Sequence, residues 1–242
     1  MATMVHEVLE ETAKRQGNTP ALRVKREGKW RTTTWEAYRR DSRRAGRALI
    51  GLGVEPGKGV ALIGYNSPEW VFADVGAILA GAVPAGIYTT STPEQVRYIT
   101  DHCEAKVAFA DTADQVEKFV VQQERMPKLE VVVQMLGSPT EAKRGRLRVL
   151  GWEEFLKLGD ETPESELEAR IKGQKPDDVC TLIYTSGTTG DPKAVMITHS
   201  NLVWTAKATI DTLSLTSNEI SVSYLPLSHI AEQMLSIHGP MK

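Results

Sequence analysis

Short apolar runs alternate with amphipathic stretches along most of the chain. Residues 60–63, 107–110 and 129–135 are largely apolar runs of strand length, which is typical of strands that are buried in a sheet. Between these runs, apolar residues recur three or four positions apart, as they do in helices with one buried side. Strands that alternate with helices favour a mostly parallel sheet covered by helices. The pattern therefore predicts an α/β fold.

Helix start and stop signals support this division. Thr33 and Glu36 have the spacing of a capping box, and Gly53 is placed to end the helix that they open. Ser67-Pro68 combines a capping side chain with a proline at the first helical position, where the missing N–H costs nothing. Residues 92–95 repeat this signal. Three helices are therefore predicted to begin at these points.

The remaining elements follow from the same patterns. Further helices are predicted over residues 113–126, 152–158, 164–171 and 199–213, further strands over 179–184 and 220–225, and a loop over 137–148. The polar connection 173–178 is a candidate boundary. We expect a first α/β portion over 1–173 and the start of a second, incomplete portion over 174–242.

The longest apolar stretch covers residues 71–87, and it contains Asp74 and Pro84. A stretch this short and interrupted does not predict a helix that crosses a membrane. It is predicted to be a core helix that leads into a buried strand.

Hydroxyl side chains and glycines follow the predicted strand over 179–184. Residues 184–193 are Tyr-Thr-Ser-Gly-Thr-Thr-Gly-Asp-Pro-Lys. Glycines let a backbone approach a ligand closely, successive N–H groups can form a concavity for an anion, and a lysine adds a charge suited to phosphate. The spacing is not that of the common P-loop, and a polar surface turn is the alternative. A polyphosphate-binding loop is the hypothesis that these residue types favour.

The same run resembles the phosphate-loop signature of the adenylate-forming superfamily, which includes acyl-CoA synthetases, luciferases and peptide-synthetase adenylation domains. It departs once, since Ala194 stands where the usual form has glycine. Residues 223–233, which read Ser-Tyr-Leu-Pro-Leu-Ser-His-Ile-Ala-Glu-Gln, resemble the motif that borders the acyl pocket in the long-chain branch. Residues 64–70 and 80–91 also resemble the bubblegum-type long-chain acyl-CoA synthetases.

The resemblance implies a partial large N-terminal domain of an enzyme that activates a long-chain fatty acid. ATP would convert the fatty acid to an acyl-adenylate, and coenzyme A would then displace AMP. Lys193 would assist the β- and γ-phosphates, and His229 would line the acyl and adenylate site. The hydroxyl residues Thr185, Ser186, Thr188 and Thr189 are expected to hold phosphate oxygens, and Gly187 and Gly190 to give the backbone its approach. Magnesium is expected with ATP, but no residue is assigned as its ligand.

Two alternatives remain at this point. Another carboxylate-activating ligase, such as an aryl-CoA ligase or an adenylation domain, would share the loop. A noncatalytic nucleotide- or acyl-binding fragment is the second alternative, because the family's enzymes are more than twice this long. Several of the family's functional motifs, its catalytic lysine among them, lie beyond His229. The resemblance thus implies an amino-terminal part that is inactive alone.

The composition of the chain agrees with the predicted fold and adds expectations about partners and compartment. The 242 residues have a formal charge of −2 and are 41% hydrophobic, as in an ordinary globular protein, so a nucleic-acid partner is not expected. Cys103 and Cys180 cannot build a disulfide framework, which fits the cytoplasm, and both are expected to be buried rather than nucleophilic. Peripheral membrane contact is an expectation that rests only on the partitioning of long acyl chains into bilayers. The spacing of Cys and His indicates no zinc site.

Overall fold

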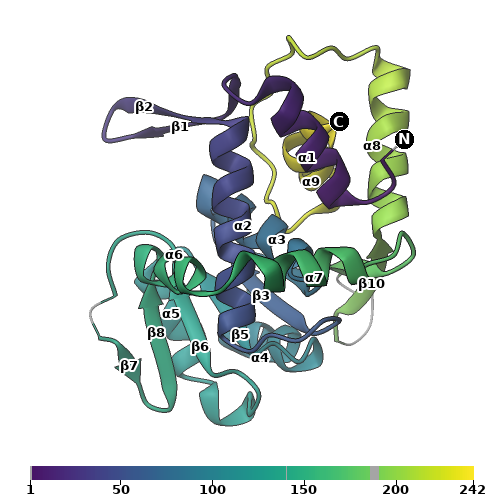
Figure 1. Cartoon of the computed structure of the whole chain (residues 1–242). Helices are drawn as coiled ribbons and strands as arrows, with labels where there is room; N and C mark the ends of the chain where they lie inside the picture. The colour runs from purple at the N-terminus through teal and green to yellow at the C-terminus, as the bar shows by residue number, and fades with distance from the viewer. Residues whose placement is uncertain (1, 140, 186–190) are drawn as a thin grey trace.

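An eight-stranded, mostly parallel sheet forms the centre of the computed structural model, which describes residues 2–139, 141–185 and 191–242 (Figure 1). Its strand order is β10-β9-β4-β3-β5-β6-β8-β7, and only the two outermost pairs are antiparallel. The strands are β3 (Gly59–Ile63), β4 (Val83–Ile87), β5 (Val107–Ala110), β6 (Val131–Gln134), β7 (Lys143–Arg144), β8 (Leu147–Gly151), β9 (Val179–Thr185) and β10 (Lys193–Thr198). The predicted α/β class with a mostly parallel sheet is confirmed.

Helices cover both faces of this sheet. Val60 and Leu62 of β3 point into a large core with α2 (Trp35–Gly51), α3 (Pro68–Leu79) and α6 (Trp152–Glu161), while Ala61 and Ile63 point into a second core with α4 (Pro93–His102) and α5 (Ala113–Val120). The alternation follows from the two-residue period of a strand. Since both faces are buried, the strand must be apolar throughout, which is the pattern that the sequence displays.

Helices α2 and α3 cross closely because each contributes a glycine. A Cβ atom on Gly76 would lie 2.7 Å from the Cβ of Ala45 and 2.9 Å from the backbone nitrogen of Gly46. Any larger residue at position 76 would push the two helices apart. Helix α7 (Glu164–Gly173) packs beside this pair.

The predicted helix starts are largely confirmed. Ser67 accepts a hydrogen bond from the amide of Trp70, and Thr92 forms a capping box with Gln95. The prediction for the helix over 33–52 was wrong by one residue, because Thr34 rather than Thr33 accepts the capping hydrogen bond. Gly53 follows this helix with φ +74°, as its stop signal indicates.

Three expectations differ from the structure, and one strand of the large sheet was not predicted. The helix predicted over 113–126 ends at Val120 and is followed by a 3₁₀ turn, η1 (Gln123–Arg125). The loop predicted over 137–148 contains β7 and the start of β8, because Leu147 is buried beside β6. Residues 220–225 form no strand in the described structure, since their alternating apolar side chains face solvent and Ile220 is 84% exposed. Strand β10 was not predicted, because its half-exposed residues lack alternation.

An antiparallel hairpin of β1 (Pro20–Arg26) and β2 (Lys29–Thr34) stands apart from the large sheet and was also not predicted (Figure 1). It follows α1 (Val5–Gln16). The carboxyl-terminal part consists of α8 (His199–Leu213), α9 (Ile230–Gln233), a π-helical turn η2 (Met234–His238) and α10 (Gly239–Met241). Helix α1 packs against this part, so the two ends of the chain lie on one side of the molecule (Figure 1).

The domain boundary expected near residue 173 stays a prediction. Strand β9 lies beyond that point but is hydrogen-bonded to β4 in the same sheet.

Candidate active site

The carboxyl ends of β3, β4 and β9 lie together at one edge of the sheet. These three strands are parallel neighbours, and they end at Ile63, Ile87 and Thr185. Open α/β sheets bind their ligands at this edge, in the crevice outside the strand ends. Both motifs that the sequence analysis selected reach it.

The first motif lies between β9 and β10. Thr185 and Lys193 are paired opposite each other where this antiparallel hairpin meets its connecting loop, and the Thr185 hydroxyl lies 3.5 Å from the carbonyl oxygen of Lys193. Both residues are exposed. The other expected phosphate-binding residues, Ser186, Gly187, Thr188, Thr189 and Gly190, lie outside the described residues. The structure therefore places two members of the expected set, side by side at the base of the loop.

The second motif crosses the same edge and is fixed there by Asn66, which follows β3. The Asn66 amide donates to the carbonyl oxygen of Leu225 and the hydroxyl of Ser223, both at 2.7 Å, and its side-chain oxygen accepts from the Leu227 amide at 3.0 Å. One side chain thus fixes three points of the 223–233 segment. The sequence analysis did not assign Asn66 to the site, although its position directly after a buried strand was a signal for it.

Close packing over β4 brings the same segment onto the sheet. A Cβ atom on Gly86 would lie 2.7 Å from the Cα of Ser228 and 3.5 Å from the ring of Trp70. Ser228 is buried against this strand. Position 86 must therefore be glycine for the residue before His229 to reach the strand end.

His229 is held by its own helix start. It is the N-cap of α9, and its Nδ1 atom accepts a hydrogen bond from the Ala231 amide at 3.1 Å. Because Nδ1 is the acceptor, the proton of the neutral ring is on Nε2. The side chain is exposed. His229 therefore offers an N–H donor to a ligand at this edge, while its backbone and Nδ1 are fixed.

Two buried polar residues of α9 complete the support of this segment. The Glu232 carboxylate accepts from the Leu225 amide at 3.1 Å, and the Gln233 amide donates to the Leu227 carbonyl at 3.0 Å. Both side chains are about 1% exposed. They bind the backbone on either side of Pro226 and so set the path of the chain into His229.

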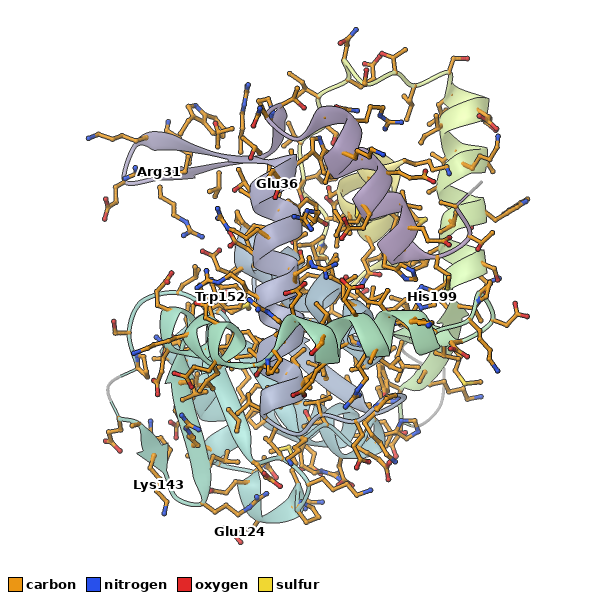
Figure 2. All side chains as sticks on the ribbon, viewed as in Figure 1. Arg31, Glu36, Glu124, Lys143, Trp152 and His199 are labelled. Atoms are coloured by element: carbon orange, nitrogen blue, oxygen red, sulfur yellow. The ribbon has the colours of Figure 1, made fainter. Side chains whose placement is uncertain are left out.

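The other histidines have structural surroundings. His199 starts α8 and accepts a hydrogen bond from the Val5 amide at 3.3 Å, and burial lowers its pKa to about 4 (Figure 2 shows its place below α1). Burial also lowers the pKa of His238 to about 3 and that of His6 below its usual value. His102 lies 2.8 Å from the hydroxyl of Tyr184 through its Nδ1 atom.

Neither cysteine has the character of a nucleophile. Both are buried, and burial raises the pKa of Cys103 to about 12 and that of Cys180 well above its usual value. The expectation that they are buried hydrophobic residues is confirmed.

Over residues 2–139, 141–185 and 191–242, no group of three or more His, Cys, Asp or Glu residues has the arrangement of a metal site. Within the same ranges, no helix combines the length and apolar character that crossing a bilayer needs.

Comparison with known proteins shows which family the chain belongs to. A family model described as AMP-binding enzyme matches residues 9–242. The long-chain-fatty-acid–CoA ligase ACSBG2 of Xenopus laevis is 42% identical over 98% of this chain and 32% of its own length. The human long-chain-fatty-acid–CoA ligase ACSBG1 is 40% identical over 96% of this chain and 32% of its own length. The chain spans about a third of the length of these curated relatives.

Solved structures share the fold. A putative long-chain-fatty-acid CoA ligase from Rhodopseudomonas palustris superposes with a TM-score of 0.81 at 18% identity, over 98% of this chain and 55% of that one. A fatty acyl-adenylate ligase from L. pneumophila, in complex with acyl adenylate and pyrophosphate, gives 0.77 at 20% identity over 100% and 38%. At these identities the likeness shows the fold alone.

Proposed function

The chain belongs to the AMP-binding enzyme family, and from that premise we propose that the whole protein is a cytoplasmic ligase that activates long-chain fatty acids. ATP and the fatty acid would form an acyl-adenylate with release of pyrophosphate, and coenzyme A would then form the thioester. The observation that carries the proposal is the meeting of two motifs at one sheet edge, since both resemble ligase motifs and relatives of 40–42% identity are named long-chain-fatty-acid–CoA ligases.

The donors at this edge of the sheet suit the first step of the reaction, in which two anions must come together. A fatty-acid carboxylate must approach the α-phosphate of ATP, and two anions repel each other. Donors that are already oriented toward the developing charge lower this barrier. We assign this task to the ammonium group of Lys193, the hydroxyl of Thr185 and the Nε2–H of His229. Ser186, Gly187, Thr188, Thr189 and Gly190 are proposed to surround the phosphates between them.

Magnesium accompanies ATP in most phosphoryl and nucleotidyl transfers. The described residues at the loop base, Thr185, Asp191 and Lys193, offer a hydroxyl, one carboxylate and an ammonium group, and no group of three or more His, Cys, Asp or Glu residues in the described structure has the arrangement of a metal site. Because magnesium prefers carboxylates and phosphate oxygens, these residues do not form a magnesium site by themselves.

Single-turnover kinetics of the whole protein test the proposal. Lys193→Ala should slow palmitate-dependent pyrophosphate release by about 10²–10³-fold, the usual effect of removing one oriented electrostatic donor. Thioester formation from a preformed palmitoyl-adenylate should change by less than about threefold, since the leaving phosphates are already gone.

The matched control is Lys157→Ala, which removes an exposed lysine of α6 and should leave both half-reactions unchanged. Equal slowing of the two half-reactions by Lys193→Ala would contradict the assigned role. If the protein preferred benzoate over palmitate in a competition assay, the proposed fatty-acid substrate would be wrong and an aromatic acid would take its place.

A further inference from the structure

The β1–β2 hairpin extends to one side of the molecule (Figure 1). Its two-residue turn, Glu27-Gly28, has φ values of +50° and +76°, as a tight hairpin turn requires. Ala21 and Leu22 pack against the large core at its base. From Arg23 through the turn to Thr32 most side chains are exposed. The base is thus anchored in the protein, and the outer part meets the surroundings.

The outer part is strongly basic. Residues 20–34 contain five basic side chains and one acidic side chain, Glu27. Arg26 forms an ion pair with Glu69 of α3 (Nη1 to Oε1, 2.8 Å). The other four, Arg23, Lys25, Lys29 and Arg31, are exposed and have no ion pair with any residue in the described parts of the chain. Figure 2 shows Arg31 on the hairpin, away from the packed helices.

One face of the hairpin combines cations with an aromatic ring. Lys25 is paired opposite Trp30, and Arg23 opposite Thr32. Residues opposite each other in an antiparallel pair project from the same face, so Arg23, Lys25 and Trp30 share one face. Trp30 is 67% exposed. A tryptophan exposed beside two cations has an apolar body and a polar N–H, the combination that is favoured at membrane–water interfaces.

We propose that this face binds the surface of an anionic lipid bilayer. Trp30 would enter the interfacial region, and Arg23 and Lys25 would lie among the phosphate and carboxylate groups of the lipids. Basic side chains near an anionic leaflet add to binding one by one, and an amphipathic aromatic ring adds to the same attachment. The attachment is peripheral and reversible, because two cations and one ring do not insert a segment into the bilayer.

Charge distribution favours a bilayer over a nucleic acid as the partner. The whole chain has a formal charge of −2, so the part outside this basic hairpin is acidic. A bilayer can meet the hairpin alone. An extended nucleic acid needs a basic track along the protein, and it would meet the acidic body beside the hairpin.

Vesicle cosedimentation measures lipid binding directly. It needs no ATP, fatty acid or coenzyme A, so the result does not depend on whether the proposed reaction is correct. The protein should bind vesicles of 70% phosphatidylcholine and 30% phosphatidylserine at least tenfold more tightly than vesicles of phosphatidylcholine alone. The binding should weaken between 50 and 500 mM NaCl, since salt screens exposed charges.

The test variant combines Arg23→Gln and Lys25→Gln. At about fivefold per basic side chain, it should lose about 25-fold in binding to the anionic vesicles. The control combines Lys157→Gln and Lys172→Gln, which removes the same charge from exposed lysines outside the hairpin, and should lose less than about threefold. Trp30→Ala should lose about tenfold, and Trp30→Phe should restore most of that loss. Circular dichroism of each variant verifies its fold.

Three results would overturn the proposal. The two double variants could lose binding equally, which would leave only a general charge effect. The protein could bind neutral and anionic vesicles alike. It could also fail to bind vesicles and bind a 30-nucleotide RNA through the same two basic residues, which would assign the hairpin to a nucleic acid.

Discussion

The centre of the sheet and its carboxyl edge are held by different forces. In β3, β4, β5 and β6 every residue is buried, and their order comes from apolar packing on both faces. The 223–233 segment has exposed residues on one side and depends on a few polar contacts, chiefly those of Asn66. The fold therefore depends on apolar packing in the centre of the sheet, while the position of the 223–233 segment depends on polar contacts at the edge.

Mutations in the two regions should therefore have different effects. Removing packing in the centre should lower global stability. Removing a polar contact at the edge should displace the site and leave most of the fold intact, because the strands do not depend on it.

The largest effect is expected at Phe109 in β5. This residue is fully buried, and its ring meets that of Phe155 edge-on with centroids 5.1 Å apart. Phe109→Ala should lower the free energy of unfolding by about 3–5 kcal/mol, because it removes the ring and leaves a cavity. Urea denaturation measures this loss of stability. The control is Trp30→Ala, which removes an exposed ring and should change the free energy of unfolding by less than about 0.5 kcal/mol. Similar losses in both variants would refute the contrast between buried centre and exposed surface.

Asp74 of α3 is a buried carboxylic acid, and its contribution to stability should depend on pH. It is 1% exposed, neither carboxylate oxygen has a hydrogen-bond partner in the described structure, and burial raises its pKa to about 8 from 3.8. The folded state therefore holds this proton more tightly than the unfolded state. The resulting stability is complete below pH 3.8 and is lost as pH rises through about 8.

Between pH 6 and 7.5 the free energy of unfolding should fall by about 2 kcal/mol from this group alone. Asp74→Asn should remove that decrease, because an amide does not titrate. Urea denaturation of both proteins across this range gives the comparison. Parallel pH profiles would show that Asp74 is ionised or solvated in the folded state.

The smallest global effect is expected at Asn66. Asn66→Ala removes three hydrogen bonds but no apolar packing, so it should cost about 1–2 kcal/mol of stability. Its local effect should be larger: hydrogen exchange at the Leu227 amide, which donates to Asn66, should accelerate at least tenfold. The amide of Leu62 should keep its protection.

Asn18→Ala is the control for this variant, because Asn18 is exposed and lies outside the site. If exchange at Leu227 and Leu62 accelerated equally in Asn66→Ala, the edge would not be separable from the centre.

The buried elements could be predicted from the sequence because their causes are local. Strand β5 has the predicted bounds, 107–110, since all four residues are buried. Helix α8 runs from His199 to Leu213 as predicted, and Ser67 caps α3 through its own hydroxyl.

The edge could not be predicted because its causes are distant in sequence. Residues 220–225 alternate like a strand, but their position depends on Asn66, which is 157 to 161 residues away from its three partners. Likewise, Gly86 reveals its role only through the approach of Ser228. Residue types led to the prediction that Lys193 and His229 belong to the site, but they did not indicate which side chains support the segment that carries His229.

Hydrogen exchange with and without ligands tests the central claim, that nucleotide and fatty acid bind where the two motifs meet. In the whole protein, magnesium-ATP with palmitate should reduce deuterium uptake in the peptides that contain residues 185–193 and 223–233. Uptake in the hairpin over 20–34 should not change. Unchanged uptake in both motif peptides, with protection elsewhere in a protein that still forms palmitoyl-adenylate, would contradict the account.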